Sequence, residues 1–110
     1  MTDRRKSPRF EVVLRARFET EVDFQEALIR SLSPGGLFLA TDSPFDAGHQ
    51  FIVEIQLPSN KGVIKGKCEV VWVNQIGVDG YPKGMGVVFV EMSPKGKKVL
   101  EEYLYQLNEN

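Results

Sequence analysis

Two short segments hold the residues whose types and spacing could bind an anionic ligand. The first is Arg5-Lys6-Ser7-Pro8-Arg9, in which two arginines lie four positions apart. The planar guanidinium fork can hydrogen-bond a guanine edge at O6 and N7, clamp a phosphate or stack on a base. Because Pro8 keeps the preceding backbone extended, the two arginines lie at most about 13 Å apart, and a bent arm could wrap one ligand. This pair suits a guanine nucleotide.

The second segment, Ser31-Leu32-Ser33-Pro34-Gly35-Gly36, ends an extended stretch of the chain. Ser31 and Ser33 lie two positions apart, so on a strand both hydroxyls point to one face. Gly36 allows a backbone or a ligand to approach closely. An arm of arginines folded over this polar floor would form a cleft with positive charge on one wall and neutral hydrogen-bonding groups on the other.

The elements that must position these segments are predicted to be short strands. From Phe10 to Phe18 apolar and polar residues alternate, which is the pattern of a half-buried strand. Further strands are expected at about 24–33, 37–41, 51–57, 63–73 and 85–91, separated by Gly and Pro. In the fifth strand, parity places four residues together on the core side: Ile64, Cys68, Val70 and Trp72.

A short C-terminal α-helix is expected at about 94–107. Ser93-Pro94 is typical of an N-cap followed by proline at the first helical position. Apolar residues then recur at helical spacing: Val99, Leu100, Tyr103, Leu104 and Leu107. This stripe would cover one end of a barrel formed by the strands, or else pack on a second subunit or a partner. Short strands followed by one helix predict an all-β chain closed into a barrel, which removes exposed sheet edges.

These motifs resemble those of the PilZ domain family. Its signature is an Arg-x-x-x-Arg arm followed, across one strand hairpin, by [Asp/Asn]-x-Ser-x-x-Gly. Arg5 and Arg9 match the first element, and Ser33 and Gly36 match the second. The stretch 84–90 and the Ser93-Pro94 helix start also resemble the PilZ ending, so the resemblance covers nearly the whole chain.

The resemblance implies a six-stranded antiparallel PilZ-type barrel with a terminal helix. It implies one domain at 11–110 behind a basic arm at 1–10, with cyclic di-GMP as ligand and no further cofactor. Arg5 and Arg9 would grip guanine edges and phosphates, while Ser33 and Gly36 would line the base pocket. An unidentified protein partner would read the bound state, and either a monomer or a homodimer is compatible with this.

Position 31 departs from the family pattern. Ser31 stands where nucleotide-binding PilZ proteins usually have Asp or Asn. A hydroxyl is shorter and offers a weaker acceptor, and one lost hydrogen bond costs roughly 1 to 3 kcal/mol. The alternative function is therefore a degenerate PilZ-like protein-interaction module that does not bind the nucleotide. Arg4 could stack on a second ligand molecule, or it could belong to a solvated basic tail.

Composition narrows the remaining classes of function. With 110 residues, 42% apolar and 26% charged, the chain is expected to form one globular domain. No apolar run is long enough for a membrane span, which predicts a cytoplasmic protein. His49 and Cys68 lie in no metal-ligand pattern and no catalytic constellation is apparent, so neither a metal site nor an enzyme is expected. Nucleic-acid binding is disfavoured because aromatic residues are not interleaved with the arm arginines, Arg15 and Arg17 on an obvious exposed face.

Overall fold

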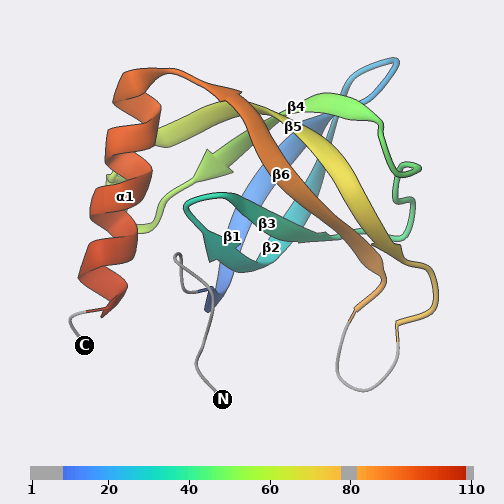
Figure 1. The fold of residues 1–110 in the computed structure, drawn as a ribbon, viewed down its shortest axis with the longest axis horizontal. Coiled ribbons are helices and arrows are strands. Elements are labelled where there is room, and N and C mark those ends of the chain that lie inside the picture. The colour runs from blue at the N-terminus through green and yellow to red at the C-terminus, as the bar shows by residue number, and fades with distance from the viewer. Residues whose placement is uncertain (1–8, 78–81, 109–110) are drawn as a thin grey trace.

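The computed structural model describes residues 9–77 and 82–108 and consists of a closed antiparallel barrel followed by one helix (Figure 1). The six strands are β1 (Phe10–Glu19), β2 (Phe24–Ser33), β3 (Gly36–Ala40), β4 (Gln50–Gln56), β5 (Val63–Asn74) and β6 (Gly84–Met92). A single 3₁₀ turn, η1 (Pro58–Asn60), joins β4 to β5. The strand order is β1-β2-β3-β6-β5-β4, and β4 closes the barrel by pairing with β1. The predicted all-β, six-stranded antiparallel barrel is confirmed.

The alternating strands place their apolar side chains inside the barrel. In β1, Leu14, Ala16 and Phe18 are buried while the residues between them are exposed. In β4, Phe51, Val53 and Ile55 are buried and the residues between them are half-buried. Full burial of a large apolar side chain contributes roughly 1.5 to 3 kcal/mol, so this repeated inward set stabilises the barrel and fixes which face of each strand remains outside.

One side chain in β5 lies on the opposite face from the one predicted. Ile64, Cys68 and Val70 are buried in the core, but Trp72 is 45% exposed. The pairing of β5 with β6 shifts register between Val70 and Trp72. A bulge adds one residue to a strand and reverses the parity beyond it, so Trp72 lies on the outer face.

The C-terminal helix α1 (Pro94–Asn108) is present as predicted. Its N-cap is Ser93, whose Oγ accepts a hydrogen bond from the Gly96 N–H at 3.0 Å. Leu100, Tyr103 and Leu104 are buried in the same core cluster as the inward strand residues. The apolar stripe of α1 therefore packs on its own barrel.

The described part of the chain contains neither a helix suited to span a membrane nor a group of side chains suited to hold a metal ion. Over residues 9–77 and 82–108, no helix is both long and apolar enough to cross a membrane. In the same ranges no group of three or more His, Cys, Asp and Glu side chains is arranged to hold a metal ion.

Candidate ligand-binding site on the outer face of the barrel

Two of the predicted site residues are in direct contact where β1 and β2 pair. Arg9 immediately precedes β1, and its Nη1 donates a hydrogen bond to Ser31 Oγ on β2 at 2.7 Å. The two residues are 22 positions apart in sequence, and the hairpin brings them together. Arg4 and Arg5, the other predicted arginines, lie outside the described residues.

The serines of the second motif face away from the barrel interior. Leu32, between them, is fully buried in the core cluster, and Phe10 opposite it also packs against that cluster. Because successive side chains on a strand point to opposite faces, Ser31 and Ser33 lie on the outer side of β2, where Ser31 is partly exposed and Ser33 is covered. The candidate site is therefore a surface feature and not an internal cavity.

Ser33 is engaged by the turn that follows it. Its hydroxyl donates to the Gly36 carbonyl oxygen and accepts from the Gly36 N–H, both at 3.2 Å, and the side chain is buried. The turn is tied to β6 because the Phe89 N–H donates to the Gly35 carbonyl oxygen at 2.9 Å. Ser33 thus shapes the site by holding the turn between β2 and β3.

Gly36 also has a structural reason for its lack of a side chain. It pairs with Val88 of β6, and a Cβ at position 36 would collide with the carbonyl oxygen of Val87. The predicted role of Gly36 was close approach of a backbone or a ligand. The backbone that approaches here is that of β6.

An aromatic pair lies beside Ser31 on the same outer face. Cross-strand pairing runs from Ser31 to Phe38, from Phe38 to Gly86, and from Gly86 to Trp72. The rings of Phe38 and Trp72 stack with centroids 5.2 Å apart and an interplanar angle of 26°. They can meet across β6 because Gly86 has no side chain, and a Cβ there would collide with the indole. We call the paired residues Glu11, Ser31, Phe38, Gly86 and Trp72 the outer row.

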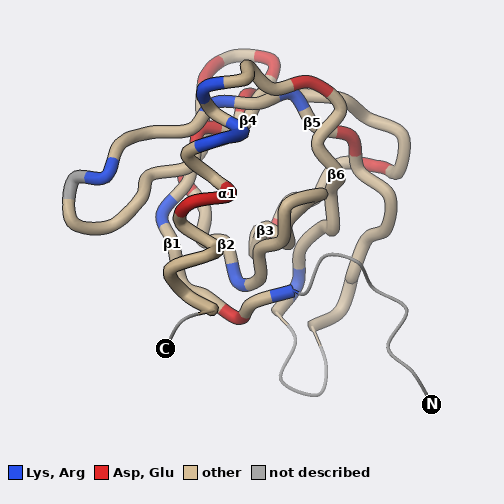
Figure 2. The backbone as a smooth tube through the Cα atoms, turned by 60° about the vertical axis from the view of Figure 1, so that its left-hand side comes forward, with Lys and Arg blue, Asp and Glu red and all other residues tan. Residues whose placement is uncertain are grey.

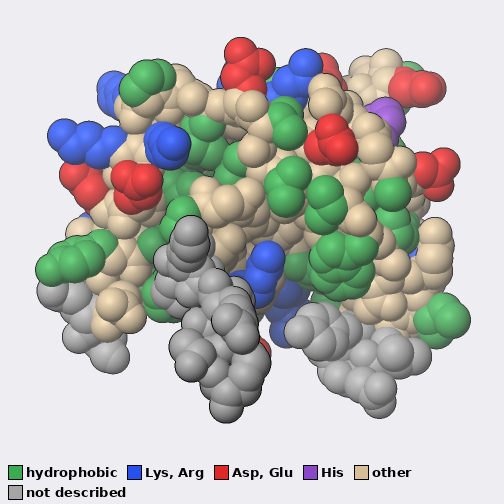
Figure 3. All heavy atoms as spheres, in the orientation of Figure 1, with side chains coloured by type: hydrophobic (Ala, Val, Ile, Leu, Met, Phe, Trp, Pro, Cys, Tyr) green, Lys and Arg blue, Asp and Glu red, His purple; other side chains and the backbone are tan. Residues whose placement is uncertain are grey.

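The exposed side of the Trp72 ring is part of an apolar area over β5 and β6. Trp72, Val88 and Val90 are each more than a third exposed. The space-filling view shows hydrophobic side chains gathered over these strands (Figure 3). Sequence reasoning missed this surface because it placed Trp72 in the core. The main sequence signal for the surface was Gly86, which leaves room for the indole.

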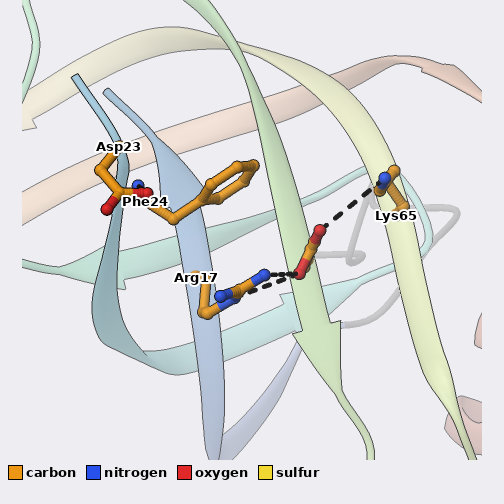
Figure 4. A network of polar contacts seen from close by, with 5 residues as sticks. Arg17, Asp23, Phe24 and Lys65 are labelled. Carbon is orange, nitrogen blue, oxygen red and sulfur yellow. Dashed lines mark hydrogen bonds and ion pairs between the residues drawn. The ribbon is translucent and has the colours of Figure 1, made fainter. Parts of the chain in front are cut away.

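The other basic residues of β1 are differently placed. Arg17 donates to Glu54 Oε1 through Nη2 at 2.8 Å and through Nε at 3.2 Å, and its guanidinium lies 4.9 Å from the Phe24 ring centroid (Figure 4). Lys65 Nζ lies 3.7 Å from Glu54 Oε2. The hydrogen bond to Glu54 raises the pKa of Arg17. Arg17 is thus held by an acidic partner rather than free to contact a nucleic-acid backbone.

Charge around the barrel is mixed. Figure 2 shows basic and acidic positions interspersed along the described strands. Arg15, in contrast to Arg17, is exposed and makes no hydrogen bond or ion pair with any residue that the structure describes.

The comparison with protein families identifies this barrel. The model of the PilZ domain matches residues 3–106. The chain belongs to the PilZ domain family. The match includes both motifs, the six strands and most of α1, so the resemblance seen in the sequence is confirmed. A search of the curated proteins finds no match.

Solved structures share the PilZ fold with this chain. The Bacillus subtilis inhibitor of motility, MotI/DgrA, superposes with a TM-score of 0.81 at 22% identity, over 99% of this chain and 54% of that one. The PilZ domain of Escherichia coli YcgR with c-di-GMP gives 0.73 at 18%, over 97% and 93%. The K. pneumonia MrkH–c-di-GMP complex gives 0.73 at 19%, over 96% and 53%. This PilZ domain thus spans about half the length of MotI and MrkH, and at these identities the likeness concerns the fold.

Proposed function

We propose that this PilZ domain is a receptor for cyclic di-GMP that passes the signal to a protein partner. The observation that carries the proposal is the contact of Arg9 with Ser31 on an outer face that continues directly into the Phe38–Trp72 pair. A cation, a hydroxyl and an exposed aromatic face suit the three parts of a guanine nucleotide: phosphate, polar base edge and base plane.

The phosphates and guanine edges would be held by arginines. Arg9 has five N–H donors and uses one on Ser31, which leaves donors free for phosphate oxygens or for guanine O6 and N7. Arg5 would grip the ligand from the arm in the same way, and Arg4 could stack on a second ligand molecule. Ser31, Ser33 and Gly36 would form the opposite wall, with Ser33 and Gly36 acting through the shape of their turn.

The base plane would rest against Trp72. The indole is 45% exposed and lies in the outer row that contains Ser31. Stacking of a base on an aromatic ring is worth about 1 to 3 kcal/mol. This term would offset the hydrogen bond lost by having serine at position 31, so binding should persist.

Transmission would follow from ordering of the arm onto the barrel, which changes the surface shown to a partner. The role is that of a cytoplasmic, non-enzymatic adaptor. The alternative is a PilZ-like interaction module without a ligand. The observation behind this alternative is the exposed apolar area around Val88 and Val90, which could contact a partner.

The deciding experiment is a calorimetric titration of cyclic di-GMP into the purified chain at near-physiological salt. We expect micromolar or tighter binding that the Arg5→Ala, Arg9→Ala double variant abolishes. Arg15→Ala is the matched control, since it removes an exposed arginine of β1 that makes no hydrogen bond or ion pair with any described residue. No heat from the native chain, together with capture of a protein partner that the double variant also captures, would establish the interaction module instead.

A further inference from the structure

We infer that Glu11, on β1, supplies the hydrogen-bond acceptor that Ser31 does not, and that it reads the N–H donors of a guanine base. The inference rests on the proposed function, because it assigns a further residue to the same site. It follows from the hydrogen bonds already made at Ser31 and from the pairing of β1 with β2.

The Arg9–Ser31 pair is rich in donors and poor in acceptors. Ser31 Oγ accepts a hydrogen bond from Arg9 Nη1 at 2.7 Å, which uses one of its two lone pairs. What remains for a ligand is the Ser31 O–H, the other Arg9 N–H groups and a single acceptor site. This pair favours phosphate oxygens and the O6 and N7 atoms of guanine, all of which are acceptors.

Guanine also carries donors, at N1–H and at the N2 amino group. Donors removed from water without a partner cost about 1 to 3 kcal/mol each, so a guanine site needs an acceptor beside the arginine. A carboxylate is the strongest acceptor among protein side chains, since it has two oxygens and no proton to donate.

Glu11 is the carboxylate that the fold brings to this position. It pairs directly with Ser31 across β1 and β2, and it is exposed. Its neighbour Phe10 and the partner of Phe10, Leu32, pack inward, so Glu11 and Ser31 lie together on the outer face. Directly paired side chains have Cβ atoms about 4.5 to 5.5 Å apart, and the longer glutamate can extend past the serine hydroxyl.

Two other acidic side chains on the described strands are held by neighbouring residues. Glu54 is bound by Arg17 and Lys65, and Glu69 accepts a hydrogen bond from Gln50 Nε2 at 2.8 Å. Glu11 makes no hydrogen bond or ion pair with any residue in the ranges 9–77 and 82–108, so no described side chain competes with a ligand for its carboxylate.

The experiment compares cyclic di-GMP with cyclic di-IMP, whose bases lack the 2-amino group. Calorimetry on the native chain should favour cyclic di-GMP by about 10-fold, the value of one hydrogen bond to a charged acceptor. The Glu11→Ala substitution should weaken cyclic di-GMP binding by about 10-fold or more. The variant should then bind the two nucleotides with equal affinity. Adding Ser31→Asp to Glu11→Ala should restore both the affinity and the preference, because it returns a carboxylate to the adjacent strand.

Glu26→Ala is the matched control. It removes the same charge from an exposed position of β2 opposite Arg17, remote from Ser31 along the strand, and should leave both affinities unchanged. If Glu11→Ala keeps the native affinity and preference, the role of Glu11 is wrong while the receptor function stands. If the native chain binds neither nucleotide, the receptor function fails and the role of Glu11 fails with it.

Discussion

At the scale of single residues, the notable contact is a cation held by a neutral hydroxyl. Arg9 and Ser31 form a short hydrogen bond, but the serine does not neutralise the guanidinium as a carboxylate would. The Arg9 guanidinium therefore keeps its full positive charge within this pair. Attraction of an anionic nucleotide by such an exposed charge is screened by salt, with a Debye length of about 8 Å at 0.15 M.

Replacing Ser31 with alanine tests the positioning of Arg9. The variant leaves the guanidinium in place and removes its one described partner, so we expect about 5-fold weaker cyclic di-GMP binding, the value of roughly 1 kcal/mol. Unfolding stability should stay within about 0.5 kcal/mol of native because Ser31 is on the surface. Calorimetry and thermal unfolding measure the two effects. Unchanged affinity would show that Arg9 needs no such support.

Trp72 provides an optical test of the proposed stacking. It is the chain's one tryptophan, and it lies 45% exposed in the outer row. A guanine resting on the indole should quench its fluorescence in proportion to site occupancy, and Trp72→Ala should weaken binding by about 1 to 3 kcal/mol. A fluorescence titration that stays flat while calorimetry shows saturation would place the base away from Trp72.

At the scale of elements, the site depends on how closely β3 approaches β6. The two strands pair from Gly36 with Val88 to Ala40 with Gly84, and glycines stand at both ends of the pairing. The turn before β3 is held by Ser33 on one side and by the Phe89 N–H on the other. The motif glycine and serine are therefore part of the barrel's construction as well as of the proposed ligand wall.

Alanine substitution at the two adjacent glycines separates these roles. Gly36→Ala places a Cβ against the Val87 carbonyl oxygen, which is backbone and cannot move aside cheaply, so we expect about 2 kcal/mol or more of destabilisation. Gly35→Ala is the control, since a Cβ there meets no atom within 4 Å. Chemical denaturation of both variants checks this. Equal stability of the two would mean that β3 and β6 can separate without cost.

At the scale of the whole molecule, the barrel and its helix follow from patterns that one sequence displays. Alternation in β1 and β4 and the Ser93-Pro94 start of α1 are local signals, and each produced the element predicted. Trp72 was placed wrongly because a bulge depends on the pairing partner, which no local pattern reveals. The pairing of Glu11 with Ser31 was missed for the same reason, since register across a hairpin depends on both strands and their turn.

Burial of Cys68 makes the unfolding stability of the barrel depend on pH in the alkaline range. Desolvation raises the pKa of this thiol from its ordinary value of 9.0 to about 12. The unfolded thiol ionises above pH 9 while the folded one does not, so stability should fall between pH 9 and 12, by up to about 1.4 kcal/mol per pH unit from this group. Thermal unfolding measured from pH 9 to 12 should show that the stability of the Cys68→Ala variant falls less steeply with pH than that of the native chain. Parallel profiles would mean that other groups dominate.

The strand order also determines when a nascent chain can first build the site. The turn that carries Ser33 and Gly36 is completed by β6, and Gly36 pairs with Val88 near the other end of the chain. Such distant pairings close slowly, since a long loop must be ordered before any contact is gained. During synthesis, residues up to 83 would leave the ribosome with β3 paired to β2 but still lacking its other neighbour, β6. If the proposed receptor function holds, a domain truncated before β6 would keep Ser33 and Gly36 but lose the strand that holds their turn, so it should not bind the messenger.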